Sequence, residues 1–120
     1  MIGRVILLHA MLDVPFLLTD SSRIEAPFVV DTGFSGELTL PVQDVETLQL
    51  QLIGTKRALL ADNTASEHPV YRANILWDGV EKSVVVMAMG ERPLLGTALL
   101  EGHSLKIRFV ENGTVLIEAL

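Results

Sequence analysis

Two dipeptides set between apolar runs constrain the fold of this chain more than any other feature. Asp78-Gly79 divides the segment "ILWDGVEKSVVVMAM", and Asn112-Gly113 divides "LKIRFVENGTVLIEAL". Both dipeptides favour two-residue turns at positive φ, and such turns join antiparallel strands. In "SLKIRFV" apolar and polar residues alternate as far as Phe109, which is the period of a strand with one wet face. The second half of the chain therefore predicts at least two β-hairpins.

The first half of the chain shows further strand patterns. Residues 2–9, 14–19 and 26–30 are rich in Val, Ile, Leu and Phe, and Asp20-Ser21-Ser22 supplies turn chemistry between two of these segments. Together they predict a β-meander. Two more strand-like segments flank a polar tip at residues 62–69, which predicts a long hairpin.

Helical patterns are short and few. Pro41 stands before "VQDVETLQL", whose apolar residues recur at helical spacing, and residues 97–101 allow a second helix that Gly102 would end. We therefore predict an all-β chain with one or two short helices. A length of 120 residues suits a single domain over residues 1–120.

Composition narrows the classes of partner. Hydrophobic residues make up 49% of the chain, so its surface is expected to carry apolar area that a partner subunit could cover. The formal net charge is -6, and the nine Lys and Arg residues are scattered, so nucleic acid is not an expected partner. No apolar stretch reaches the roughly 20 residues needed to span a bilayer, so no membrane association is expected.

Metal, cofactor and secretion signals are also lacking. The chain has no cysteine, and His9, His68 and His103 share no ligand-like spacing, so neither a metal nor a cofactor is expected. The opening "MIGRVILLHAMLDVPFLL" is interrupted by His9 and Asp13, and no small-residue cleavage site follows. We therefore expect a cytoplasmic protein.

The segment "FVVDTGFSGELTLP" raises the question of function. Asp31 ends an apolar run and enters a turn built from Thr, Gly, Phe, Ser and Gly. Burying a lone carboxylate is costly unless it is paired, hydrogen-bonded or neutralised. Asp31 could be a turn residue that caps the backbone amides of Gly33 to Ser35. Alternatively, it is a catalytic carboxylate whose partner lies elsewhere.

A second segment favours the catalytic interpretation. "VVDTGFSGELTLP" is followed about sixty residues later by "PLLGTALLEGHSLKIRF". The two segments resemble the retroviral-type (retropepsin-like) single-domain aspartic proteases, specifically their short prokaryotic relatives, and the similarity covers most of the chain. The resemblance implies a closed β-barrel of the retropepsin-like acid protease type. It also implies a homodimer in which each subunit contributes one Asp from an Asp-Thr-Gly motif.

The resemblance assigns roles to individual residues. Asp31, Thr32 and Gly33 would form the catalytic motif, with Thr32 bonding across the dimer axis and Gly33 allowing close approach. Leu95 and Gly96 would form the second structural motif, with Gly96 packed behind the catalytic loop. The hairpin from about residue 59 to residue 73 would act as a flap over an extended peptide. The residues implied to bind substrate are Phe34, Ser35, Leu60, Ala61, Asp62 and Asn63.

Some positions depart from the family pattern. Phe34 stands where the familiar enzymes have Ala or Ser, and it would line a substrate pocket or the dimer interface. Thr97 and Ala98 replace the Arg and Asp common in retroviral enzymes, so a salt-bridge network is not expected there. Retroviral enzymes interlace their chain ends into a shared sheet, and "TVLIEAL" could do the same, although another dimer would use other surfaces.

Two functions remain open from the sequence. The first is a homodimeric aspartic endopeptidase that hydrolyses peptide bonds with water activated by two Asp31 residues, one per subunit. The alternative is a catalytically silent module with the same fold, which binds a peptide or supports assembly while Asp31 only shapes its loop. In a third interpretation the chain is a monomer with an unused Asp31.

Overall fold

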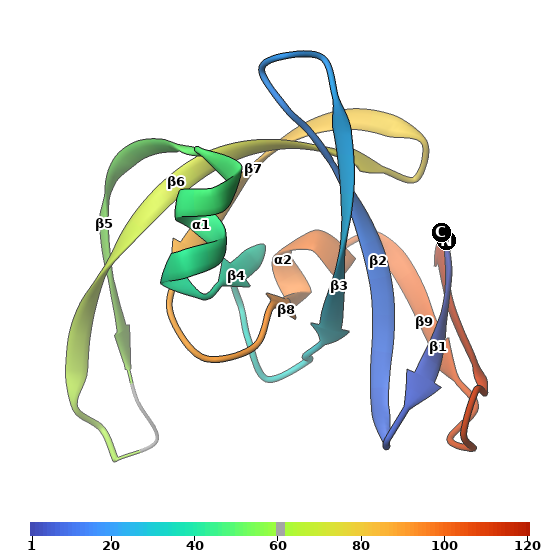
Figure 1. The fold of residues 1–120 in the computed structure, drawn as a ribbon. Coiled ribbons are helices and arrows are strands. Elements are labelled where there is room, and N and C mark those ends of the chain that lie inside the picture. Colours follow the sequence, from blue (N-terminus) through green and yellow to red (C-terminus); the bar gives the residue numbers. More distant parts are fainter. Residues whose placement is uncertain (60–61) are drawn as a thin grey trace.

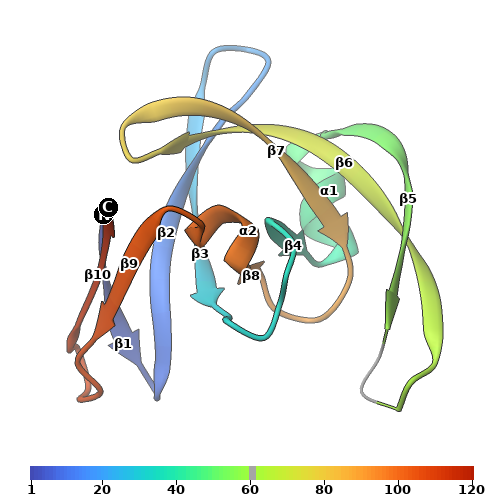
Figure 2. The same cartoon turned by 180° about the vertical axis from the view of Figure 1, so that it is seen from behind.

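The computed structural model describes residues 1–59 and 62–120 of the chain. One sheet and two short helices form the molecule (Figures 1 and 2). The elements are β1 (Ile2–Ile6), β2 (His9–Leu17), β3 (Arg23–Val30), β4 (Leu38–Leu40), α1 (Val42–Leu48), β5 (Gln51–Leu59), β6 (Ala65–Trp77), β7 (Val80–Ala88), β8 (Leu94–Leu95), α2 (Thr97–Leu100), β9 (His103–Ile107) and β10 (Thr114–Ala119).

The sheet curls into a ring that is close to a barrel. Its strand order is β5-β6-β7-β4-β8-β3-β2-β1-β10-β9, and a further pairing of β6 with β2 joins two strands that are far apart in this order. Strands β6, β7, β4, β8, β3 and β2 therefore close on themselves. The prediction of an all-β, barrel-type fold with one or two short helices is confirmed: the ring is near a barrel, and two short helices are present.

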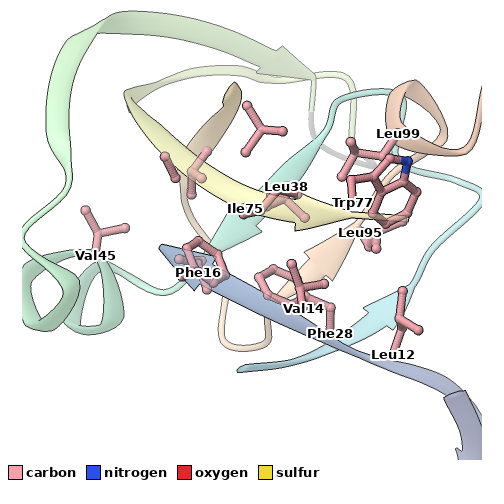
Figure 3. Close-up of a cluster of buried hydrophobic side chains, with 14 of the residues drawn as sticks. Leu12, Val14, Phe16, Phe28, Leu38, Val45, Ile75, Trp77, Leu95 and Leu99 are labelled. Carbon is pink, nitrogen blue, oxygen red and sulfur yellow. The ribbon is translucent and has the colours of Figure 1, made fainter. Parts of the chain in front are cut away.

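The main core fills this ring. Phe16 of β2 and Phe28 of β3 stack with ring centroids 5.9 Å apart, and both are fully buried. Ile75, Trp77 and Leu95 pack into the same cluster (Figure 3). These side chains come from β2, β3, β6 and β8, so their burial holds together strands that meet only in the folded chain.

Both helices and the hairpin at residues 78–79 agree with the predictions. Asp78 and Gly79 have φ of 53° and 77°, and they join β6 to β7 as a two-residue turn. Helix α1 begins directly after Pro41, and α2 ends before Gly102. Within the described ranges, 1–59 and 62–120, no helix has the length and apolar character to cross a membrane.

Several boundaries differ from the predictions. The strands predicted over residues 14–19 and 26–30 are observed as β2 (His9–Leu17) and β3 (Arg23–Val30). The strand predicted over residues 2–9 breaks at Leu7-Leu8, where β1 turns directly into β2 with Ile6 opposite His9. The polar tip predicted over residues 62–69 is shorter, because β6 already begins at Ala65. The turn at Leu7-Leu8 was not predicted because apolar residues are not typical of turns. The start of β6 was predicted too late because its first residues are polar, as in a loop.

The strand predicted to include Phe109 ends earlier, at Ile107. Beyond it the Val110 N–H donates to the Arg108 carbonyl, and the Gly113 N–H donates to the Val110 carbonyl. These local bonds turn the backbone away from the sheet, and Phe109 is 62% exposed. The apolar-polar alternation therefore continues past the end of the strand into a loop. The two-residue turn predicted at Asn112-Gly113 is also wrong, because the connection spans residues 108–113 and only Asn112 of the pair has a positive φ, of 62°.

The C-terminal strand lies inside the sheet. β10 pairs with β1 on one edge and with β9 on the other, all within the same chain. A strand with both edges occupied cannot add a strand from another subunit. In this fold "TVLIEAL" therefore pairs within its own chain, which favours the other dimer surfaces that the sequence left open.

Candidate active site

Asp31 lies at the end of β3, where the barrel wall gives way to a loop. The N–H of Asp31 donates to the Leu95 carbonyl at 2.9 Å, which continues the parallel pairing of β3 with β8. Its side chain is half-buried, and Oδ1 accepts a bond from the Gly33 N–H at 2.8 Å. The Phe34 N–H closes the turn on the Asp31 carbonyl at 3.2 Å. The carboxylate is thus held in one place by its own loop and remains open to solvent.

The rest of the Asp-Thr-Gly motif faces outward. Thr32, Gly33 and Ser35 are exposed. Among the residues that the structure describes, the Thr32 hydroxyl makes no hydrogen bond. A Cβ added to Gly33 would lie 3.2 Å from Oδ1 of Asp31, so a glycine here leaves space directly beside the carboxylate.

The segment at Gly96 holds this loop from behind. The N–H groups of Gly96, Thr97 and Ala98 donate to the carbonyls of Glu37, Phe34 and Gly36, at 2.9, 2.8 and 3.2 Å. These donors belong to the start of α2, where backbone N–H groups have no partner inside the helix. A Cβ added to Gly96 would lie 2.7 Å from the Phe34 carbonyl oxygen. The close approach of loop and helix therefore requires glycine at this position, with Leu95 fully buried beside it.

Phe34 folds back against its own loop. Its ring lies close to Gly36 and Gly96, so that a Cβ on either glycine would approach ring atoms to 2.5 Å. The same residue lines a cavity of about 320 Å³ together with Ser35, Lys56 of β5 and Met87 of β7. This cavity lies between the loop and the long hairpin.

A second cavity, of about 360 Å³, contains Asp31 and Thr32. His9 and Arg92 also line it, and the two side chains are hydrogen-bonded at 2.8 Å. No local sequence pattern indicates that His9 belongs to the site. Its position follows from the register of β2 and β3, which pairs Met11 with Val29 and, if continued, brings residue 9 opposite residue 31. That register becomes readable only once the turn at residues 7 and 8 is known.

The expected flap is the hairpin of β5 and β6. Asp62 and Asn63 lie exposed in its turn, and Asn63 has a φ of 65°. The Thr64 hydroxyl and N–H donate to the Asp62 carboxylate at 2.6 and 3.0 Å, and these bonds lower the pKa of Asp62 below its ordinary value of 3.8. The other two residues assigned to the flap, Leu60 and Ala61, lie outside the described residues.

Two side-chain hydrogen bonds fix the strand that follows the loop. Glu37 accepts a bond from the Val85 N–H of β7 at 2.9 Å. Thr39, which is buried in β4, accepts one from the Leu94 N–H at 3.1 Å. Neither residue stands out in the sequence, because their partners are about fifty positions away along the chain. Both bonds tie β4 to its neighbours and so fix the loop that carries Asp31.

Groups of three or more potential metal ligands were sought over the described ranges, and none occurs there. The polar chemistry beside Asp31 comes instead from Thr32, His9 and Arg92. A single carboxylate with a cavity on each side of its loop can orient water or a peptide carbonyl. A second acid group would have to come from another molecule.

Comparisons with known proteins agree with this architecture. No protein-family model matches the chain, and no curated protein matches it. Among solved structures, the chain is similar to the crystal structure of a retropepsin-like aspartic protease from Rickettsia conorii. The TM-score is 0.61 at 20% sequence identity, and the match covers 100% of this chain and 91% of that chain. The likeness establishes a retropepsin-like fold.

Proposed function

We propose that this chain, which has a retropepsin-like fold, is a homodimeric aspartic endopeptidase. The observation that carries the proposal is the state of Asp31: a half-buried carboxylate at the end of a barrel strand, held by the Gly33 N–H and open to a cavity. In the Rickettsia conorii structure the same fold belongs to a protein described as an aspartic protease.

The proposed reaction needs two carboxyl groups that share one proton. The ionised group accepts a proton from water as the water oxygen bonds to the peptide carbonyl carbon, and the protonated group donates its proton to the carbonyl oxygen. The C–N bond of the tetrahedral diol then breaks as one carboxyl group passes its proton to the leaving nitrogen. One hydroxyl of the diol gives its proton to the other carboxylate as the new carbonyl forms, which restores the pair with one shared proton. Because each chain supplies one Asp31, the second carboxyl would come from a symmetry-related copy.

The substrate would be an extended peptide segment. Phe34, Ser35 and Met87 line the cavity between the Asp31 loop and the β5–β6 hairpin, and this cavity offers an apolar wall for one side chain of the peptide. The backbone of the hairpin would pair with the peptide as an added strand. Closure of the hairpin would exclude water from the reacting bond.

Cleavage of an unfolded protein, measured from neutral to mildly acidic pH, tests the proposal. The wild-type chain should cleave, and Asp31→Asn should lower the rate at least about a thousandfold, because the amide keeps the shape but cannot act as base. Glu91→Gln, an exposed change, is the control and should cleave normally. Equal cleavage by wild type and Asp31→Asn would refute the assignment.

A second candidate function has one observation in its favour. The bond from the Gly33 N–H already gives Asp31 a purely structural task, as in a turn cap. In that case the fold would bind a peptide in the groove without cutting it. Peptide binding by a wild-type chain that shows no cleavage at any pH would favour this alternative.

A further inference from the structure

The proposed dimer needs a contact surface that the chain ends do not provide. Both edges of β10 are occupied, by β1 and by β9. The Ile117 N–H donates to the Met1 carbonyl at 2.9 Å, so the two ends hold each other. In Figures 1 and 2 the termini lie well above the lower side of the molecule, where β3 ends at the Asp31 loop. Strand addition to β10 therefore does not supply the contact, and another surface near the Asp31 loop is needed.

The turn between β1 and β2 has an unusual composition for its shape. Leu7 and Leu8 have φ of 48° and 68°, in the region that favours Asn and Gly. Their side chains are 76% and 79% exposed. The turn thus places two large apolar groups in water at strained backbone positions. Such strain concentrates where a side chain has a task beyond folding.

A second apolar turn lies directly beside it. Phe109 and Val110, in the loop between β9 and β10, are 62% and 63% exposed. The Val5 N–H donates to the Gly113 carbonyl and the Asn112 N–H donates to the Val5 carbonyl, both at 2.8 Å. These bonds join the loop to the end of β1. The two turns therefore form one surface.

The acidic group of this surface is already engaged in the turns. Glu111, the acidic residue of the second loop, accepts a bond from the Leu7 N–H at 3.1 Å. Its charge is therefore directed at the backbone of the neighbouring turn. We name the resulting surface the apolar patch and define it by four residues: Leu7, Leu8, Phe109 and Val110.

The apolar patch lies on the same side of the molecule as the candidate site. Leu8 directly precedes His9, and His9 shares its cavity with Asp31. The β1–β2 turn, the β9–β10 loop and the end of β3 all lie on the lower side in both views (Figures 1 and 2). A molecule seated on the patch would therefore also reach the Asp31 loop.

We propose that the apolar patch is the surface through which two copies of this chain associate, and that this contact brings their Asp31 loops together. The inference rests on the proposed function, because a site with one carboxylate per chain is incomplete without a second copy. A symmetric contact uses the same patch twice, so four large apolar groups from each copy are removed from water. Such an apolar contact can overcome the repulsion between two chains of net charge -6.

Sedimentation equilibrium of two patch variants tests this proposal. The double variant Leu7→Asn, Leu8→Gly replaces the leucines with the dipeptide that this turn prefers, so the fold is retained while the apolar groups are removed. The second variant, Phe109→Ser with Val110→Ser, changes the other turn. Val80→Ser is the matched control, because Val80 is 68% exposed but lies in the β6–β7 hairpin.

Both patch variants should raise the dimer dissociation constant at least about tenfold, since each removes two buried apolar contacts per copy. Val80→Ser should associate like the wild type. A wild-type chain that stays at 13.1 kDa at all concentrations, or patch variants that associate like the wild type, would overturn the proposal.

Parallel cleavage assays separate this inference from the proposed function. If the patch variants lose association but no chain cleaves through Asp31, the contact surface stands and the protease assignment fails. If the patch variants associate normally and cleave through Asp31, the protease assignment stands and the surface fails.

Discussion

Around Asp31 the loop is shaped by packing on glycine. The Phe34 ring occupies space that side chains at Gly36 and Gly96 would fill, and the Thr97 N–H and hydroxyl both donate to the Phe34 carbonyl, at 2.8 and 3.3 Å. Thr97 stands where retroviral enzymes commonly have Arg. An aromatic ring and backbone hydrogen bonds therefore hold the loop in this chain, and neither requires a charge.

Alanine substitutions at Gly96 and Gly33 should have different effects, the first mainly on the free energy of unfolding and the second mainly on the rate of cleavage. Gly96→Ala should lower the free energy of unfolding by about 1–3 kcal/mol, because its Cβ would overlap the backbone of the Asp31 loop. Gly33→Ala should change that free energy by less than about 1 kcal/mol, because its neighbour is a side-chain oxygen that can move. That movement displaces Oδ1 of Asp31, so cleavage should fall at least about tenfold.

Urea denaturation and peptide cleavage measure the two effects. Gly33 and Gly96 both lie outside the left-handed backbone region, so alanine adds no strain of its own at either position. A Gly96→Ala chain as stable as the wild type would show that loop and helix do not pack as described. If Gly33→Ala cleaves at the wild-type rate, cleavage does not depend on the space that Gly33 leaves beside the Asp31 carboxylate.

Among the elements, the shortest strands position the site. β4 has three residues and β8 has two, yet they lie between the long strands β7 and β3 at the centre of the sheet. The bonds to the Glu37 carboxylate and the Thr39 hydroxyl add to the few backbone bonds that such short strands can make. The long β5–β6 hairpin, by contrast, has β5 at an open edge of the sheet. At its turn, the Asp62 carboxylate accepts hydrogen bonds from the nearby Thr64 N–H and hydroxyl.

The turn of this hairpin should respond to acid through Asp62. Its folded-state pKa is lowered, chiefly by the Thr64 hydroxyl and then by the Thr64 N–H. The carboxylate therefore stabilises the turn fully above the ordinary value of 3.8, and this contribution is lost as the pH falls through the lowered pKa. The turn stays formed at the mildly acidic pH that suits a shared-proton carboxyl pair.

An NMR titration of the side-chain carboxyl carbons measures this shift. Thr64→Val removes the hydroxyl and keeps the N–H, so the pKa of Asp62 should rise part of the way back toward 3.8. Asp20 is the internal control, since Ser22 lowers its pKa in the same way and Thr64→Val leaves that contact intact. An unchanged titration of Asp62 in the variant would exclude the hydroxyl as the cause.

The elements also show what the sequence could predict. Asp78-Gly79 specifies its turn locally, so that hairpin was predicted with its two turn residues. Leu7-Leu8 makes a similar turn with apolar residues that give no turn signal, so this turn was not predicted. The neighbours of β10 and the meeting of His9 with Asp31 depend on pairing between distant segments. Local patterns do not encode such pairing, so these features required the folded structure.

On the scale of the whole molecule, the chain ends and the candidate site lie on different sides of the ring of strands. The pairing of β2 with β6 closes the ring, and the chain ends join β1 and β10 away from the Asp31 loop (Figure 1). The lower side carries the end of β3, the β1–β2 turn and the β9–β10 loop, and the last two contain the residues of the apolar patch. The Asp31 loop and the surface proposed for association therefore lie on the same side of each copy.

Association of the whole molecule should depend on pH and salt. Each copy has a net charge of -6, so dimer formation brings like charges together. Protonation of carboxylates and histidines makes both chains less negative as the pH falls, so the dissociation constant should fall several-fold from neutral to mildly acidic pH.

Sedimentation equilibrium at the two pH values, in low and in high salt, separates this charge effect from the apolar contact. High salt screens the repulsion, so at neutral pH it should tighten association and reduce the difference between the two pH values. The loss of association in the patch variants should persist in high salt, because screening does not weaken the burial of apolar groups. A dissociation constant that is the same at both pH values in low salt would show that net charge does not govern assembly. Rescue of the patch variants by salt alone would show that their defect is electrostatic.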